Sequence, residues 1–186
     1  MKYSLPLMPN SYGSLVYRAL AVSGVACLAT PSVHAQQMTV SFDIPRMKVA
    51  EYHRPYVAIW IEDEKGKAVT TLRVLYDVDL KADDGRKWLA DMRGWWRKAG
   101  RNAKMPADGI SGPTQAPGTH RVSFAANKRP LGRLAAGSYK LQVEAAREVG
   151  GRELVTVPFN WPGKGAKTYS GKGKSELGAI SLTIKP

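Results

Sequence analysis

The sequence predicts a mainly β protein, an antiparallel immunoglobulin-like β-sandwich that carries one amphipathic, Trp-rich helix. Three observations lead to this fold class. Apolar and polar residues alternate with period two in several short segments, a single segment has helical spacing, and strands do not alternate with helices as they do around a parallel sheet. About seven short strands in a chain of this size are typical of a sandwich.

Residues 1–35 have the features of an export signal. Lys2 and Arg18 are basic residues before or at the start of an apolar run (19–29), and residues 33–35 (VHA) place small residues at the −3 and −1 positions of a cleavage site. A retained membrane anchor is disfavoured, because the apolar run is too short to span a bilayer stably. We therefore expect cleavage after Ala35 and a single mature domain over residues 36–186.

Charge and cysteine content limit what the mature domain can do. The formal net charge is +13, and two of these charges lie in the signal, which leaves +11. In an exported protein this excess indicates an anionic membrane surface, a phosphate-bearing ligand or an acidic partner rather than nucleic acid, although a solvated basic surface fits equally well. The only cysteine, Cys27, leaves with the signal, so the mature chain has no thiol for disulfides, metal binding or catalysis.

The first strands follow from the alternation. Period two predicts strands over Met38–Ile44, Tyr56–Ile61 and Val69–Tyr76. The turn residues 63–66 (DEKG) lie between the last two, which predicts a hairpin.

An internal echo predicts two more strands. Residues 116–126 (APGTHRVSFAA) align without gaps with residues 135–145 (AAGSYKLQVEA), and we expect them to form successive strands of one sheet. After a turn at 149–152, Glu153–Phe159 is predicted as a strand that Pro158 places near a sheet edge or strand end.

The C-terminal region contains one more predicted strand. Residues 160–176 are rich in glycine and lysine and predict a long mobile loop. Leu177–Ile184 is predicted as the last strand.

The segment Gly85–Ala99 has apolar residues at helical spacing and predicts one amphipathic helix, capped by Asp83-Asp84. Gly94 weakens this helix by about 1 kcal/mol relative to Ala. Packing of the helix on the sandwich explains Trp88, whereas Trp95 and Trp96, among Arg93 and Arg97, fit equally a wall for a flat anionic ring system.

Other chemistry has little support in the sequence. Only His53 and His120 remain in the mature chain, without a zinc-type spacing, and each is expected to be a partly exposed strand histidine. No G-x-S-x-G motif or recognisable carboxylate pair is present. We therefore expect neither a metal site nor an enzyme with its own catalytic residues.

Several segments resemble the predicted periplasmic proteins of domain-of-unknown-function family 2271. They cover most of the mature chain and comprise PYVAIWIEDEKGKAVTTL (55–72), KWLADMRGWWR (87–97), SGPTQAPGTH (111–120), AAGSYKLQVEAAREVGG (135–151) and ELGAISL (176–182). Residues 134–145 (LAAGSYKLQVEA) also resemble the Ig-like repeat of flagellar hook-capping proteins, which supports the sandwich. The family resemblance implies a periplasmic protein that accompanies PepSY-type membrane proteins and the transferase that moves FMN from FAD onto other proteins.

Targets of that transferase carry a motif similar to D-G-x-[ST]-G-A-[ST], whose last hydroxyl residue receives FMN. Residues 108–114 (DGISGPT) match it at Asp108, Gly109, Ser111, Gly112 and Thr114, and Pro113 replaces the alanine. The resemblance thus implies a covalent FMN on Thr114. The same seven residues also fit a plain turn into the following strand.

Two functions remain open from the sequence. The first is an FMN carrier in extracytoplasmic electron transfer linked to PepSY-type reductases or iron acquisition, with Thr114 as anchor, Asp108, Ser111 and Gly112 as its loop, and Trp95 and Trp96 as a ring-binding surface. The alternative is a non-redox interaction or ligand-binding module. Either protein could make peripheral contact with a membrane.

Overall fold

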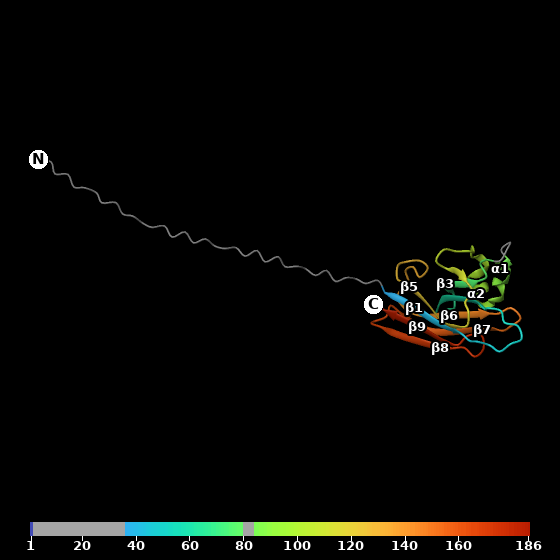
Figure 1. Cartoon of the computed structure of the whole chain (residues 1–186). Helices are drawn as coiled ribbons and strands as arrows, with labels where there is room; N and C mark the ends of the chain where they lie inside the picture. Colours follow the sequence, from blue (N-terminus) through green and yellow to red (C-terminus); the bar gives the residue numbers. More distant parts are fainter. Residues whose placement is uncertain (2–35, 80–83) are drawn as a thin grey trace. The chain divides into compact units, whose positions relative to one another are not determined.

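The computed structural model describes Met1, residues 36–79 and residues 84–186. Apart from Met1, the predicted signal peptide with its cleavage site lies outside these residues, as does Asp83 of the predicted helix cap. Figure 1 shows the strands of the domain in two sheets, with the short helices at one end. The elements are β1 (Gln37–Ile44), β2 (Tyr56–Asp63), β3 (Ala68–Tyr76), α1 (Asp84–Lys87), α2 (Arg93–Lys98), β4 (Ser111–Pro113), β5 (Gly118–Ala125), β6 (Gly137–Ala146), β7 (Arg152–Trp161), β8 (Lys167–Lys172) and β9 (Ala179–Lys185), with 3₁₀ helices at Trp88–Asp91 and Gly100–Asn102.

The predicted β-sandwich is confirmed. One sheet has the strand order β5-β1-β9-β8 and the other has the order β4-β3-β2-β6-β7. The hairpin of β2 and β3 forms as expected, and β7, which contains Pro158, is an edge strand. Every pair is antiparallel except β3 with β4, which run parallel.

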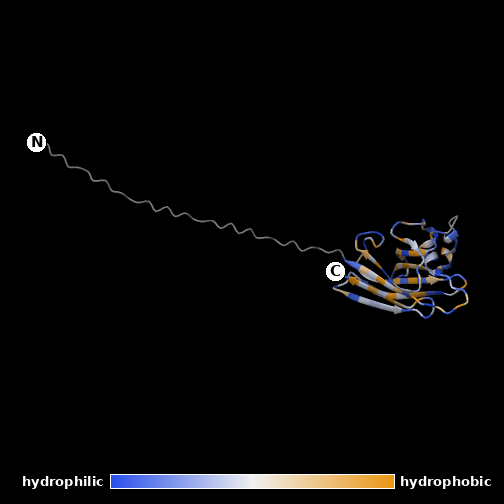
Figure 2. Ribbon diagram, viewed as in Figure 1, coloured by the Kyte–Doolittle hydropathy of each residue, from blue (hydrophilic) through white to orange (hydrophobic). Residues whose placement is uncertain are grey.

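The second sheet is buried on both faces. Its inner face packs on the first sheet, where buried apolar positions alternate with more exposed polar ones along β1 and β9 (Figure 2). Its outer face packs under the helical segment through Trp60 of β2, Val74 of β3 and Trp95 of α2. Strand β2 therefore has six consecutive buried residues, because both of its faces have a partner.

The prediction of one helix over 85–99 is wrong in detail, because this segment folds into several short helices. The backbone of Met92 (φ −76°, ψ 67°) leaves the helical region just before α2. At that break the buried carboxylate of Glu144, on β6, accepts the N–H groups of Gly94 at 2.9 Å and of Trp95 at 2.7 Å. These donors are free only at a helix N-terminus, so the contact to the sheet requires α2 to begin there.

Two further expectations are corrected by strand pairing. The echoed segments form β5 and β6, but β5 pairs with β1 and β6 pairs with β2 and β7, so they belong to different sheets. The predicted loop over 160–176 contains β8, which pairs along its whole length with β9. Both differences arise because strand partners are chosen by contacts between distant residues and not by local pattern.

Candidate functional site

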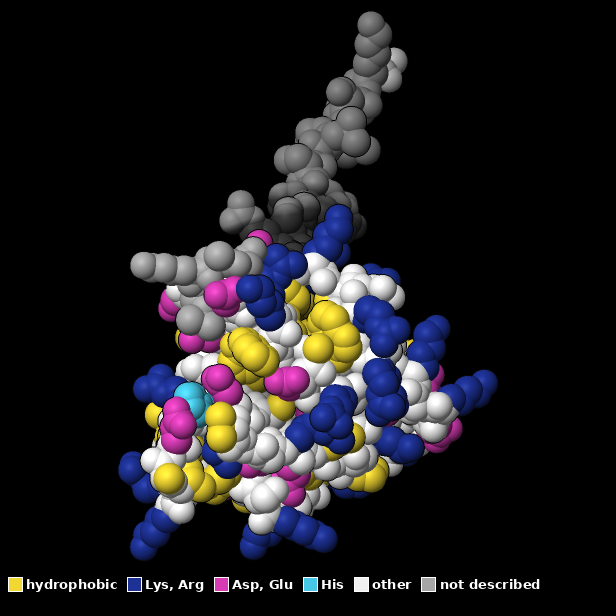
Figure 3. All heavy atoms as spheres, turned by 90° about the vertical axis from the view of Figure 1, so that its right-hand side faces the viewer, with side chains coloured by type: hydrophobic (Ala, Val, Ile, Leu, Met, Phe, Trp, Pro, Cys, Tyr) yellow, Lys and Arg dark blue, Asp and Glu magenta, His cyan; other side chains and the backbone are white. Residues whose placement is uncertain are grey.

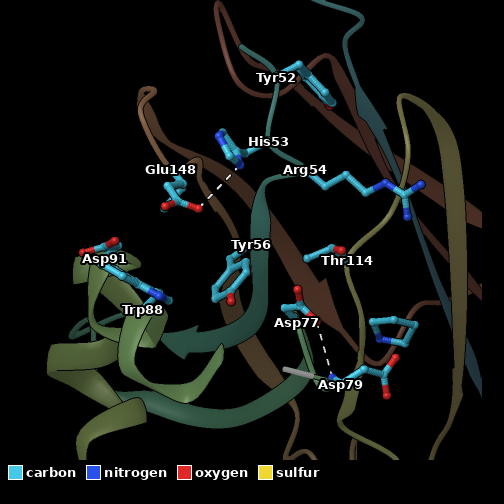
Figure 4. Close-up of a pocket in the computed structure, with 12 residues that line it drawn as sticks. Tyr52, His53, Arg54, Tyr56, Asp77, Asp79, Trp88, Asp91, Thr114 and Glu148 are labelled. Atoms are coloured by element: carbon cyan, nitrogen blue, oxygen red, sulfur yellow. Dashed lines mark hydrogen bonds and ion pairs between the residues drawn. The ribbon is translucent and has the colours of Figure 1, made fainter. Parts of the chain in front are cut away.

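A cavity of about 440 Å³ opens at one edge of the second sheet, close to the helical segment (Figure 4). In an antiparallel pair, one strand begins where its neighbour ends. The start of β2 therefore lies beside the ends of β3 and β6, and the end of β4, which is parallel to β3, lies there too. We call this space the Thr114 cavity and define it by Tyr52, Tyr56, Asp77, Trp88, Thr114 and Glu148, which line it together with other residues.

Thr114 lies immediately after β4, at the wall of this cavity. The residue is half-buried, and its hydroxyl makes no hydrogen bond to another described residue. In Figure 4 it stands next to Asp77, and the side chain of Arg54 extends past it. A hydroxyl in this position is free to take part in a new bond.

The other residues of the DGISGPT segment have structural roles. Gly109 has a φ of +71°, a conformation that favours glycine. The Ser111 hydroxyl accepts the N–H of Ala107 at 2.9 Å and so closes the turn into β4. Asp108 is exposed, while Gly112 leaves room for β4 to approach the side chain of Leu75 on β3. The motif therefore builds a tight turn and a short edge strand that ends at Thr114.

Pro113 is compatible with this arrangement. It pairs with Tyr76 in the parallel ladder, and β4 is the outermost strand of its sheet. An edge strand tolerates proline, because its missing N–H interrupts no second ladder. The departure from the alanine of the motif thus has a place in the fold.

Aromatic side chains form the wall opposite Thr114. Tyr56 contacts Tyr76 edge to face with ring centroids 6.2 Å apart, and Trp88 is 49% exposed. Burial is the main cause that raises the pKa of both Tyr52 and Tyr56 above the ordinary value of 10.0. Both phenols are therefore neutral near pH 7, and the buried Tyr52 hydroxyl has no partner among the described residues.

The charge of the cavity differs from that of the whole chain. Asp77, Asp79, Asp91 and Glu148 line it, whereas Arg54 is the only Arg or Lys among its lining residues. Figure 3 shows acidic side chains around exposed hydrophobic ones on this side of a surface otherwise rich in Lys and Arg. Glu148 is paired with His53 at 3.5 Å, and the other three carboxylates have no ion-pair partner among the described residues.

The two tryptophans predicted as a ring-binding wall are not part of this cavity. Trp95 is fully buried and donates its indole N–H to the Thr71 hydroxyl at 3.0 Å, so it belongs to the core. Trp96 is half-buried and packs against the cluster of Trp60, Val74 and Trp95 between the second sheet and the helical segment. Trp88, which the sequence assigns to the core, is the tryptophan that lines the cavity. The break at Met92 lies between Trp88 and Trp95, so the two side chains do not belong to one continuous helix and can face different ways.

Neither histidine forms a metal site with its neighbours. His53 lies before β2 and contacts Glu51 at 3.0 Å as well as Glu148. His120, on β5, bonds the carbonyl oxygen of Ala116 at 2.7 Å. Within residues 36–79 and 84–186, no group of three or more His, Cys, Asp or Glu side chains is placed to hold a metal ion.

The comparison with protein families decides what the chain is related to. Residues 37–179 match the family described as "Predicted periplasmic protein (DUF2271)". The chain belongs to this family. The match covers all the elements of the sandwich up to the start of β9, including the Thr114 cavity, and it supports a periplasmic location.

Other comparisons add no relative, since no curated protein and no solved structure matches the chain. Among the described residues, no helix is long and apolar enough to cross a membrane.

Sequence reasoning found Thr114 but missed the residues around it. Tyr56 begins β2, Asp77 follows β3, and Tyr52 lies in the segment before β2. No functional motif marks these residues, and Tyr56 and Asp77 meet only because β2 and β3 are neighbours. The signal that could have found them is the position of polar and aromatic residues at or near the ends of predicted strands, where strands meet the loops that carry binding residues.

Proposed function

We propose that this periplasmic protein carries FMN covalently on Thr114 and serves extracytoplasmic electron transfer, linked to PepSY-type membrane reductases or iron acquisition. One observation carries the proposal. The threonine at the acceptor position of the motif is half-buried beside an aromatic cavity with its hydroxyl free, while the hydroxyl of Ser111 is engaged in the turn.

The aromatic residues of the cavity are compatible with the ring system of a flavin. The rings of Tyr52, Tyr56 and Trp88 offer apolar surface for a flat ring system, and the unpartnered Tyr52 hydroxyl can donate a hydrogen bond. The volume of about 440 Å³ lies in the range of cofactor sites. When bound, FMN supplies reversible one- or two-electron transfer, and the chain supplies its anchor and surroundings.

The linkage chemistry needs only a hydroxyl from this chain. A phosphoester bond forms between Thr114 Oγ1 and the FMN phosphorus, the pyrophosphate bond of FAD breaks, and AMP leaves. The proton of the hydroxyl passes to a base of the FMN transferase. An acceptor at the end of an edge strand suits this reaction, because one side of β4 has no strand partner.

Intact mass after co-expression tests the proposal. The chain is produced in the periplasm together with an FMN transferase, as wild type, Thr114→Ala, Ser111→Ala and Thr119→Ala. We expect a mass gain of one FMN minus water and a yellow protein for the wild type, complete loss of both in Thr114→Ala, and retention in the other two. Thr119 is the matched control, since it is an exposed threonine five residues further on.

Two outcomes would contradict the carrier function. One is an unmodified wild-type chain under conditions that flavinylate a known target. The other is a modified Thr114→Ala chain, which would place the flavin elsewhere.

A second function, non-redox binding of a small ligand, is favoured by the acidic lining of the cavity. Asp77, Asp79 and Asp91 without ion-pair partners would attract a cationic ligand whose apolar part packs on Trp88. The same mass measurement separates the two functions, because a ligand-binding module remains unmodified.

A further inference from the structure

We infer that a second, basic cleft on the other side of β4 is a binding site for a phosphate group. The cleft has a volume of about 220 Å³ and is lined by Arg73, Gly112, Gln115, His120 and Arg121 with a few apolar neighbours. It lies between β4 and β5, which are the edge strands of the two sheets. Pro113 lines both this basic cleft and the Thr114 cavity.

The inference rests mainly on Arg73, whose Nε lacks a hydrogen-bond partner. It lies on β3 opposite Ile59 of β2, a core residue, so its side chain starts from the inner face of the sheet. The residue is half-buried, its Nε is buried without a hydrogen-bond partner, and its guanidinium has no ion pair with any described residue. A buried N–H without a hydrogen-bond partner costs free energy unless an acceptor meets it, and an anion is the acceptor that also offsets the guanidinium charge.

The surroundings of Arg73 select a negative ligand. No Asp or Glu lines the basic cleft, whereas Arg121 and His120 do. His120 is held in place by its hydrogen bond to Ala116 and by its ring contact with Phe42, with centroids 5.5 Å apart. Water could satisfy the Nε–H of Arg73, but only an anion neutralises the charge of two guanidinium groups.

A phosphate group is the anion that fits best. Guanidinium forks bind tetrahedral oxyanions with paired hydrogen bonds, and the volume leaves room for such an ion but not for a nucleotide with its base. Two sources share this chemistry: free phosphate, and the phosphodiester of a flavin on Thr114, which depends on the proposed function.

An NMR titration of the unmodified chain with inorganic phosphate tests the site. Chloride at equal ionic strength is the reference, because it screens charge in the same way. We expect saturable shifts confined to the amides of residues 112, 114 and 115 and of residues 120–122. Arg73→Gln should weaken the affinity by at least about tenfold, as expected for the loss of one charge-assisted contact.

Two other variants make the test specific. Arg121→Gln, at an exposed residue whose substitution should leave the fold intact, should also weaken binding, whereas Arg101→Gln removes an exposed arginine outside the basic cleft and should change nothing. Shifts that rise linearly over the whole basic surface, or equal affinities in all variants, would overturn the inference.

A second arm identifies the source of the phosphate. The titration is repeated on chain loaded with FMN by the transferase. Loss of free-phosphate binding assigns the basic cleft to the flavin phosphodiester, and retained binding assigns it to a separate ligand. Failure of flavin loading removes this arm only, because the unmodified chain still tests the cleft.

Discussion

Gly94 is unfavourable for a helix when judged from sequence, but its contacts in the fold require a glycine. A Cβ atom there would lie 2.9 Å from one carboxylate oxygen of Glu144 and 3.3 Å from the other. Glu144 cannot move aside, since it is fully buried, bonded to two N–H groups of α2 and paired with Arg152. Glycine is therefore required for the helix to approach the sheet, although helix propensity alone favours alanine.

We predict that Gly94→Ala destabilises the protein by about 1–3 kcal/mol, because the added methyl group overpacks this contact. Urea unfolding measures the change. Gly137→Ala is the matched control, since its nearest atom would be in Tyr139 at 3.6 Å and its stability should change by less than about 0.5 kcal/mol. Equal stability of Gly94→Ala and the wild type would contradict the contact.

At the scale of elements, the segment that looks like a loop from sequence is held by one carboxylate. Glu153, on β7, accepts the N–H groups of Ser175 at 3.0 Å and Leu177 at 2.9 Å, and also that of Lys174. These bonds connect β7 of one sheet to the turn between β8 and β9 of the other. The C-terminal end of the glycine-rich segment is thus held to β7.

Stability should depend on pH through Glu153. Burial acts to raise the pKa of its carboxyl, but the N–H groups of Lys174, Leu177 and Ser175 outweigh burial and place the pKa below the ordinary value of 4.5. Because the folded-state pKa is lower than the unfolded-state one, the ionised carboxyl stabilises the fold above pH 4.5, and this stabilisation is lost as the pH falls through the folded-state pKa.

We predict that Glu153→Ala costs about 1–3 kcal/mol at pH 7, from the lost charge-assisted hydrogen bonds, and progressively less below pH 4.5. Urea unfolding of the wild type and the variant, over about four pH units from pH 3 to pH 7, measures the difference in their free energies of unfolding. Glu64→Ala is the control, because Glu64 is exposed in the turn between β2 and β3. A constant difference across this range would contradict the assignment.

For the whole domain, the second sheet connects two apolar clusters. Ile59 of β2 belongs to the cluster between the sheets, and the next residue, Trp60, belongs to the cluster under the helices. Loss of packing in either cluster would expose one face of β2, the strand on which the other cluster also packs. The layers should therefore unfold together.

We predict that the amide of Trp95, which bonds Glu144, exchanges hydrogen with the same opening free energy as the amides of β2 and β6. Native-state hydrogen exchange on residues 36–186 measures these values. The amides of the exposed residues Glu148 and Val149 serve as the fast-exchanging reference. A helical segment that opens well below the strands would show that it is a separate unit.

The sequence by itself determined most of the strands and the candidate acceptor. Burial of one strand face leaves a period of two in the local sequence, so β1, β2, β3, β7 and β9 were predicted closely. The DGISGPT motif identified Thr114 by residue type and spacing, which are also local properties.

Only the tertiary structure decided which sheet each strand joins, where the helix breaks, and which side chains meet Thr114. These features depend on contacts between residues far apart in sequence, such as Glu144 with Gly94 or β4 with β3. A long-range contact leaves no period in either segment, because each partner keeps the pattern of its own element. For the same reason the exposure of Trp88, the burial of Trp95 and the unpaired Arg73 became visible only in the folded chain.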